Sequence, residues 1–238
     1  MNIYITGINK ECGKTVISAG IAAVMQSLGY KACVYKPVQT GAIDKGKYLI
    51  SPDLTFVKMV DSYITTHSTY MLAEKVLPVI SDKKEKTEIS IKNIKKDYSV
   101  LCKKAETIIV EAPCSLMSPI AADNFAYEIP LELKTPIVLV ITPSADSLGQ
   151  YLSEINSAKS IGLDILGVII NKYPVYSEIP EIKLFPELIE KYSDVKVLGL
   201  IRNFRAKSIS ANTLITEIIN GIDLEDVFRM KIPKLNMY

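Results

Sequence analysis

Short apolar runs, rich in β-branched residues, recur along the chain and alternate with longer segments of helical periodicity. Several runs are apolar almost throughout, which is typical of strands that helices cover on both faces, because neither side of such a strand meets water. The pattern therefore predicts a parallel sheet. The expected strands are Asn2 to Thr6, Ala32 to Lys36, Thr107 to Glu111, Ile137 to Ile141, Leu166 to Asn171 and Val195 to Ile201.

The segments between these strands carry apolar residues at the spacing of one helix face. Thr15 to Leu28 and Leu148 to Ile161 are expected helices, and Gly29 and Gly162 follow them as stop signals. A third helix is predicted by the spacing of Ile91, Ile94, Tyr98, Leu101 and Ala105. Right-handed crossovers would build a doubly wound, mostly parallel α/β sheet, whose ligands bind beyond the carboxyl ends of the strands.

A polar, lysine-rich segment runs from Asp82 to Lys96. Runs of charge are usually solvated. We expect a solvated loop here that leads into the third helix.

The composition agrees with a folded α/β domain. Of 238 residues, 48% are hydrophobic and 23% charged, which is enough apolar material for a large core. We expect a single domain over residues 1–238, because α/β sheets of this length commonly form one domain. The formal net charge of +2 is too balanced to indicate nucleic acid or a membrane surface as a partner.

Cysteine and histidine usage narrows the chemistry. Four cysteines without a CxxC pair are typical of free thiols in a reducing compartment. His67 is the only histidine, which excludes His-rich zinc sites and leaves one residue for any Ser or Cys hydrolase triad. The chain shows no secretory signal pattern and no run near the roughly 18 apolar residues of a membrane span, so we expect a cytoplasmic protein.

The segment from Gly7 to Thr15 lies between the first expected strand and the first expected helix and resembles a phosphate-binding loop. Gly13 allows a tight turn at a helix N-terminus, Lys14 supplies charge for phosphate, and Thr15 supplies a hydroxyl for magnesium. Five residues separate the two glycines, whereas the general motif has four. The alternative is an ordinary strand-to-helix turn.

Polar residues also follow the other strands at the same expected edge. Lys36 ends the second strand, where its charge reaches either a transferring phosphoryl group or solvent. Glu111 ends an apolar strand, as expected of a carboxylate that holds Mg²⁺. Asp53 is either a helix N-cap or a second magnesium ligand, and Asn171 is either a turn residue or an amide for an adenine edge.

Taken together, these segments resemble the dethiobiotin synthetase family, from the first residue to about Asn203. The family's first loop has the same five-residue gap, and the positions that agree with it are Gly7, Glu11, Gly13, Lys14 and Thr15. Its Lys-Pro-Val-x-[Ser/Thr]-Gly motif is matched fully by Lys36 to Gly41. Its downstream aspartate matches Asp53, and its third-strand frame fits Glu111 followed by Ser118, Pro119 and Ile120.

The resemblance implies an ATP- and Mg²⁺-dependent ligase with a P-loop NTPase fold. In this reaction 7,8-diaminononanoate and CO₂ form a carbamate that attacks the γ-phosphate, and the mixed anhydride closes to the ureido ring of dethiobiotin. Lys14 and Lys36 would be catalytic, stabilising charge on the transferring phosphoryl group. Such chemistry depends on positioning and electrostatics rather than on a histidine base, which suits a chain with one histidine.

The resemblance also implies a set of binding residues and a homodimer with the diamine at the subunit interface. The implied magnesium ligands are Thr15, Asp53 and Glu111. The implied nucleotide-binding residues are Glu11, Cys12, Gly13, Lys14, Thr15, Val16, Asp53, Glu111, Asn171, Lys172, Ile201 and Arg202. The implied substrate-binding residues are Thr40, Leu148 and Gly149.

Four segments depart from the family pattern. Ala112 to Ser115 replaces a glycine-rich run, and Pro113 has no N–H to offer a ligand. Arg202 replaces a proline near the expected adenine pocket, where its guanidinium either stacks on a base or faces water. The other two departures are Leu77 to Val79 and Gln150 to Ser153. An ATP-dependent enzyme acting on a different amine or carboxylate is therefore an open alternative.

A second alternative is a regulatory or partitioning ATPase of related fold that switches a protein partner. Such proteins usually carry a lysine five positions before the phosphate lysine, where this chain has Asn9. A third is an amidating ATPase that acts on a corrinoid, but such chains normally add a glutaminase domain for which this length has no room.

Cys12 and Cys114 fall in two loops that the expected fold brings to one sheet edge. They are either a redox-sensitive pair or two buried, unreactive thiols. Cysteine is among the most buried residue types, which favours the second interpretation.

Overall fold

The computed structural model describes residues 1–9, 11–144, 146–203 and 210–232. Its central feature is a sheet of seven described strands in the order β11-β10-β9-β1-β8-β2-β6, in which every neighbouring pair is parallel. The strands are β1 (Asn2–Thr6), β2 (Ala32–Tyr35), β6 (Thr65–His67), β8 (Thr107–Glu111), β9 (Ile137–Ile141), β10 (Ile165–Tyr173) and β11 (Val197–Arg202).

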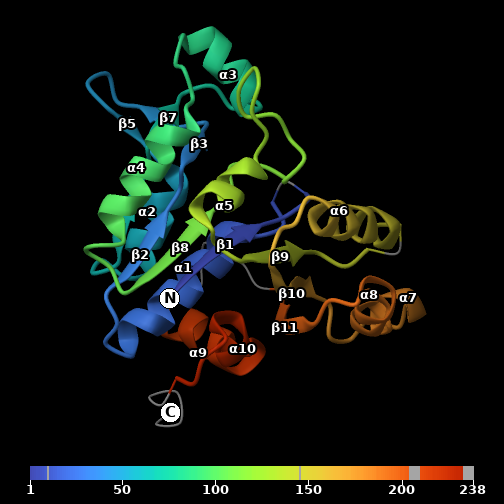
Figure 1. Cartoon of the computed structure of the whole chain (residues 1–238). Coiled ribbons are helices and arrows are strands. Elements are labelled where there is room, and N and C mark those ends of the chain that lie inside the picture. The colour runs from blue at the N-terminus through green and yellow to red at the C-terminus, as the bar shows by residue number, and fades with distance from the viewer. Residues whose placement is uncertain (10, 145, 204–209, 233–238) are drawn as a thin grey trace.

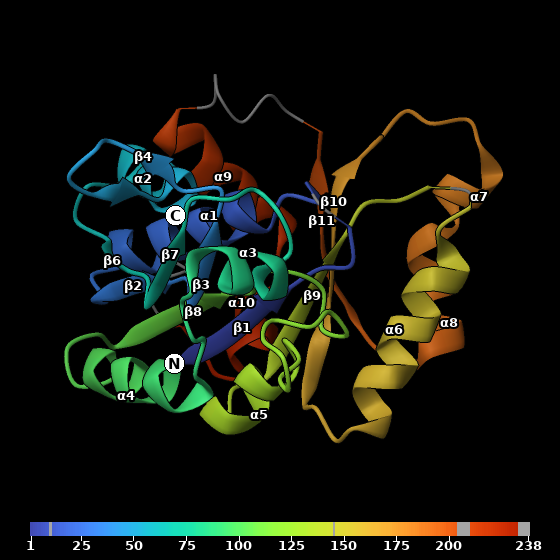
Figure 2. The same cartoon turned by 90° about the horizontal axis from the view of Figure 1, so that it is seen from above.

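Helices cover both faces of this sheet (Figure 2). On one face lie α1 (Lys14–Ser27), α2 (Pro52–Val60), α9 (Ala211–Gly221) and α10 (Leu224–Phe228). On the other lie α4 (Ile91–Leu101), α5 (Glu128–Leu133), α6 (Leu148–Ser160) and α8 (Phe185–Ser193). Alternate residues of each strand therefore enter opposite cores: in β1, Tyr4 packs with the α4–α6 layer and Ile5 with the α1 layer.

Smaller elements gather beside the sheet. The parallel pair β3 (Val38–Thr40) and β7 (Tyr70–Leu72) and the antiparallel pair β4 (Ile43–Asp44) and β5 (Leu49–Ile50) lie near α3 (Pro78–Glu85) at one end of the molecule (Figure 1). The short helix α7 (Pro180–Lys183) precedes α8. Among the described residues, no helix is both long enough and apolar enough to cross a bilayer.

The predicted doubly wound α/β fold is confirmed. Each of the six expected strands exists, with ends that differ by at most two residues, and the three expected helices correspond to α1, α4 and α6. The edge strand β6 was not predicted, because a three-residue strand with exposed and half-buried positions has no continuous apolar run.

The expectation of a solvated loop from Asp82 is wrong at its start. Residues 82–85 form the last turn of α3, and only residues 86–90 separate this helix from α4. Pro78 at the start and two lysines in the last turn favour a helix here. The Glu85 carboxylate also accepts hydrogen bonds from the Ser81 hydroxyl and from the backbone amides of Ala73 and Glu74. These bonds stabilise a helical turn whose polar sequence predicted a solvated loop.

Candidate active site

The loop between β1 and α1 has a backbone shape that only particular residues tolerate. Gly13, the N-cap of α1, has φ 94°, and a Cβ atom there would lie 2.0 Å from Nδ2 of Asn171. A Cβ at Gly7 would lie 2.6 Å from the carbonyl oxygen of Val140. In the part of the chain that the structure describes, no side chain caps α1. The amides of its first turn can therefore donate to an anion.

Two residues near the end of β10 bind the backbone of this loop. The buried Asn171 donates from Nδ2 to the carbonyl oxygen of Cys12 at 2.8 Å, and Lys172 donates from Nζ to the carbonyl oxygen of Glu11 at 2.6 Å. Both predicted nucleotide-binding residues thus contact the loop backbone. The Asn171 amide has a second N–H and an acceptor oxygen besides this bond, and its role at an adenine edge stays a prediction.

Lys36 is a buried cation between two carboxylates. Its Nζ lies 2.5 Å from Oδ2 of Asp53 and 2.7 Å from Oε1 of Glu111, and its side chain is only 6% exposed. Burial lowers the pKa of Lys36, but the two carboxylates outweigh burial and the net pKa is above its ordinary value. Lys36 therefore remains protonated in this environment and does not simply reach solvent.

Glu111 links this ion pair to the phosphate loop. Its Oε1 also accepts a hydrogen bond of 2.8 Å from the Thr15 hydroxyl, while its Oε2 is buried and has no hydrogen-bond partner among the described residues. A buried carboxylate oxygen without a partner is costly unless a cation or donor meets it.

Asp53 lies in the first turn of α2 and is not its cap. The N-cap is Ser51, whose Oγ accepts from the amide of Leu54 at 3.1 Å and donates to Oε1 of Gln39 at 2.6 Å. The N-cap alternative for Asp53 is therefore wrong, and its carboxylate is directed at Lys36 instead. Ser51 and Gln39 were not predicted as part of the site, although Ser followed by Pro and Asp is a recognisable helix-start signal.

These residues fit a magnesium ion together with phosphate. Within the described ranges, no three His, Cys, Asp or Glu side chains gather into a metal site. Mg²⁺ usually takes only one or two carboxylates and completes its shell with phosphate oxygens and water. The partnerless Oε2 of Glu111, the adjacent Thr15 hydroxyl and the nearby Asp53 supply that kind of donor set.

Curated relatives agree with this arrangement. An ATP-dependent dethiobiotin synthetase from Bacillus cereus strain B4264 is 30% identical over 201 residues, which are 84% of this chain and 83% of the relative. The chain belongs to the dethiobiotin synthetase family. A second such synthetase, from Caldicellulosiruptor saccharolyticus, is 27% identical over 206 residues and 84% of each chain. The predicted family, that of ATP-dependent ligases, is confirmed.

Two further comparisons concern the fold. A family model described as an AAA domain matches residues 1–206. The septum site-determining protein MinD from Pyrococcus horikoshii, solved as an Mg-ADP complex, aligns with a TM-score of 0.61 at 19% identity, over 98% of this chain and all of that one. At this identity the likeness concerns the fold alone, and together with the AAA-domain match it agrees with the predicted fold of P-loop NTPase type.

The other positions expected from dethiobiotin synthetases come from four elements, and their roles stay predictions. Thr40 ends β3 and is half-buried, and Leu148 and the exposed Gly149 begin α6. Val16 lies in the first turn of α1, and Ile201 is buried in β11.

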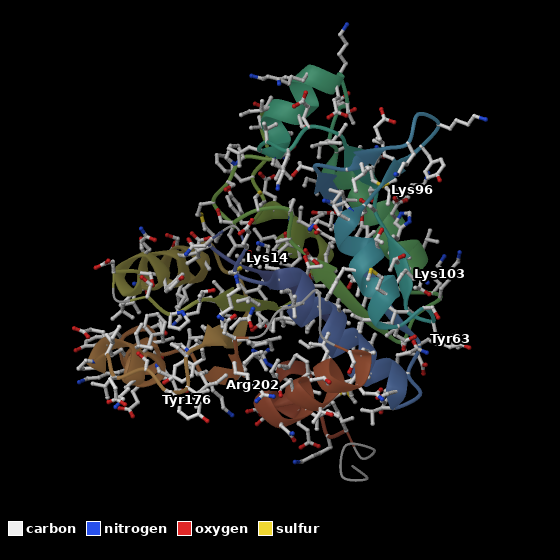
Figure 3. The ribbon with its side chains drawn as sticks, turned by 180° about the vertical axis from the view of Figure 1, so that it is seen from behind. Lys14, Tyr63, Lys96, Lys103, Tyr176 and Arg202 are labelled. Carbon is white, nitrogen blue, oxygen red and sulfur yellow. The ribbon has the colours of Figure 1, made fainter. Side chains whose placement is uncertain are left out.

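Arg202, at the end of β11, is exposed and forms an ion pair with Glu217 of α9. Figure 3 shows Lys14 at the start of α1 and Arg202 nearer to α9. Of the two alternatives for Arg202, the geometry favours the solvent-facing one.

The loop that replaces the family's glycine-rich run follows Glu111 directly. The hydroxyls of Ser115 and Ser118 are 2.7 Å apart. Burial raises the pKa of Cys114 to about 11, against the opposing charges of Lys14 and Lys36. The loop begins directly after the carboxylate that pairs with Lys36.

All four cysteines are free thiols. Burial also raises the pKa of Cys12. Two protonated thiols at this edge favour the unreactive interpretation of the Cys12 and Cys114 pair.

Proposed function

We propose that this protein catalyses the ATP-dependent carboxylation and ring closure of 7,8-diaminononanoate to dethiobiotin. The observation that supports this most is the buried ammonium group of Lys36, held by Asp53 and Glu111 at the sheet edge that also carries the phosphate loop. Phosphoryl transfer needs concentrated, pre-oriented charge and no histidine base. The site supplies this charge, and two relatives of the chain are named ATP-dependent dethiobiotin synthetases.

The phosphate groups of ATP would bind at the N-terminus of α1. Its first-turn amides and the Lys14 ammonium group would neutralise the phosphate chain. Mg²⁺, held by Thr15, Asp53 and Glu111, would supply further positive charge to the β- and γ-phosphate oxygens. Lys36 would stabilise the negative charge that spreads over the γ-phosphoryl oxygens during transfer.

The acceptor is a carbamate formed when one amine of the substrate adds to CO₂ and loses a proton. A carbamate oxygen attacks the γ-phosphorus, ADP leaves, and the second amine then attacks the carbonyl carbon and releases phosphate. In this proposal Thr40, at the end of β3, and the first turn of α6 at Leu148 and Gly149 would position the diamine and its carboxylate.

We further propose that the chain forms one domain and acts as a homodimer with the diamine bound near the subunit interface. The family membership supports the homodimer, and the single seven-stranded sheet with helices on both faces supports one domain.

The alternative of a partitioning ATPase receives less support. The position where that class usually carries a lysine holds Asn9, and its Nδ2 donates to the Tyr151 hydroxyl of the same chain at 3.1 Å. Such a switch would hydrolyse ATP without any diamine, whereas the ligase would not.

The test is to incubate the purified protein with ATP, Mg²⁺, bicarbonate and 7,8-diaminononanoate, and to follow released phosphate and the mass of the organic product. Phosphate release that depends on the diamine, with dethiobiotin as product, supports the proposal. ATP binding without ring formation would show that the phosphate site serves another acceptor, and a panel of other diamines and amino acids would then identify it.

A further inference from the structure

Helix α6 reaches two loops of the active site with polar side chains one turn apart. Tyr151 and Glu154 lie at i and i+3 and therefore project from the same face of the helix. Both are enclosed by protein, Tyr151 almost completely and Glu154 in part. Figure 2 shows α6 beside α8 at one end of the sheet.

Tyr151 joins the phosphate loop to the end of β9. Its hydroxyl donates to the carbonyl oxygen of Thr142 at 2.7 Å and accepts from Nδ2 of Asn9 at 3.1 Å. The ring packs edge-on against Phe185 with centroids 5.9 Å apart, which fixes the direction of the hydroxyl. A phenylalanine here would keep the packing and lose both hydrogen bonds.

Glu154 holds the loop that follows Glu111. Its Oε1 accepts a hydrogen bond of 3.1 Å from the amide of Leu116, and the amide of Met117 also donates to this carboxylate. Burial raises the pKa of Glu154, while the two amide bonds oppose that rise. Removing a carboxylate from water costs free energy, and the two amide hydrogen bonds offset that cost.

The held loop is the one that departs from the family's glycine-rich run. Pro113 fixes its own φ and removes an amide, so the loop cannot turn its backbone as a glycine run would. Leu116 is fully buried, which leaves its amide dependent on a protein acceptor. Glu154 is that acceptor, and it holds the loop together with the backbone hydrogen bonds from Tyr127 to Leu116 and from Ala126 to Ser118.

We propose that Glu154 is a positioning residue for the acceptor substrate, and that Tyr151 performs the corresponding task for the nucleotide. The proposal rests on the function proposed above, because it assigns the loop of residues 112–118 to the acceptor. In this proposal α6 fixes the loop of residues 112–118 through Glu154 and, independently, the phosphate loop through Tyr151.

The experiment compares the wild-type protein with Glu154→Ala, Glu154→Gln and Tyr151→Phe. Steady-state kinetics give KM for the diamine and for ATP, and titration gives the Kd for ATP. Hydrogen exchange measures the protection of the Leu116 and Met117 amides without any need for turnover.

Glu154→Ala is expected to raise KM for the diamine by about tenfold to a hundredfold, the effect of losing hydrogen bonds to a charged group. The Kd for ATP stays within about twofold, and exchange at Leu116 and Met117 accelerates. Glu154→Gln keeps an acceptor oxygen and restores most of the protection and affinity. Tyr151→Phe is expected to have the opposite effect. It weakens ATP binding by about threefold to tenfold and leaves the protection of the Leu116 and Met117 amides unchanged.

Unchanged exchange at Leu116 and Met117 in Glu154→Ala overturns the proposal, as does an equal loss of ATP and diamine affinity. If the wild-type protein does not act on the diamine at all, the proposed function fails by itself. The exchange data and the ATP titration then still decide whether Glu154 holds the loop independently of the nucleotide.

Discussion

Lys36 and Glu111 form a buried ion pair in which Nζ lies 2.7 Å from Oε1, at the point where two neighbouring parallel strands end. Among the described residues, Lys36 also pairs with Asp53, and Glu111 also accepts a hydrogen bond from Thr15. Loss of either residue should therefore reduce both the stability of this edge of the sheet and its catalytic activity.

Replacing Lys36 with alanine removes the ammonium group and leaves Glu111 buried without its partner. Turnover is expected to fall about 10²- to 10³-fold, the usual effect of losing one pre-oriented electrostatic donor. Because breaking a buried pair also destabilises a protein by about 3–5 kcal/mol, urea unfolding must accompany the kinetics. Near-normal turnover by the folded variant would refute the role of Lys36.

Glu111→Gln keeps the size of the side chain and removes its negative charge. We expect a higher Mg²⁺ concentration for half-maximal nucleotide binding, by at least about tenfold, since one charged metal ligand is lost. Glu132→Gln is the matched control, because Glu132 is exposed and pairs with Lys95 far from the loop in sequence. Equal Mg²⁺ dependence of the two variants would remove Glu111 from the metal site.

Gly13→Ala places a Cβ atom 2.0 Å from Nδ2 of Asn171 at a residue with φ 94°. The loop has to move, so ATP binding should fall below detection in a titration. Gly162→Ala separates the effect of a positive φ from that of the close contact. Gly162 also has positive φ (80°), but no atom lies within 4 Å of its Cβ position. That control should lose about 1 kcal/mol of stability and keep its ATP affinity. Normal ATP binding by Gly13→Ala would contradict the loop assignment.

Asp97 gives a pH dependence of stability with a defined sign. Burial raises its pKa, but hydrogen bonds from His67 and Thr69 outweigh burial and lower the pKa below the ordinary value of 3.8. A lowered carboxyl pKa stabilises the fold above pH 3.8, and this contribution disappears as the pH falls through the folded-state value.

In urea titrations, Asp97→Asn should therefore be less stable than wild type at pH 6 and should approach it in acid. The difference should be below about 1 kcal/mol, since both partners are partly exposed. A constant difference from pH 7 to pH 3 would show that Asp97 acts through packing instead of charge.

The thiols of Cys12 and Cys114 should react slowly. A pKa of about 11 keeps Cys114 protonated at pH 8, so iodoacetamide should label the exposed Cys102 first, and labelling of Cys114 should accelerate as the pH rises. Mass spectrometry of peptides measures this order directly. Activity lost on mild oxidation and restored by a reductant would support the redox pair instead.

Much of the fold could be predicted because continuous apolar strands and helical periodicity are local signals. The ends of β1, β8 and β9 agree with the sequence to the residue. The edge strand β6 was missed because it has no continuous apolar run, and the last turn of α3 was missed because the bonds from the amides of Ala73 and Glu74 to Glu85 are not a local signal.

From the sequence alone, the rule that ligands bind beyond the carboxyl ends of parallel strands predicts Lys14, Lys36 and Glu111 at one edge of the sheet. It did not show that Ser51 caps α2, or that Gln39, Tyr151 and Glu154 support the site. Their roles depend on distances between elements that are remote in sequence, and no motif encodes those distances.

The most direct test of the account uses ¹³C-labelled bicarbonate with ATP, Mg²⁺ and 7,8-diaminononanoate. We expect one labelled carbon in dethiobiotin and one phosphate released for each ring formed, with no release when the diamine is omitted. Phosphate release at the same rate without the diamine, and no labelled product, would contradict it.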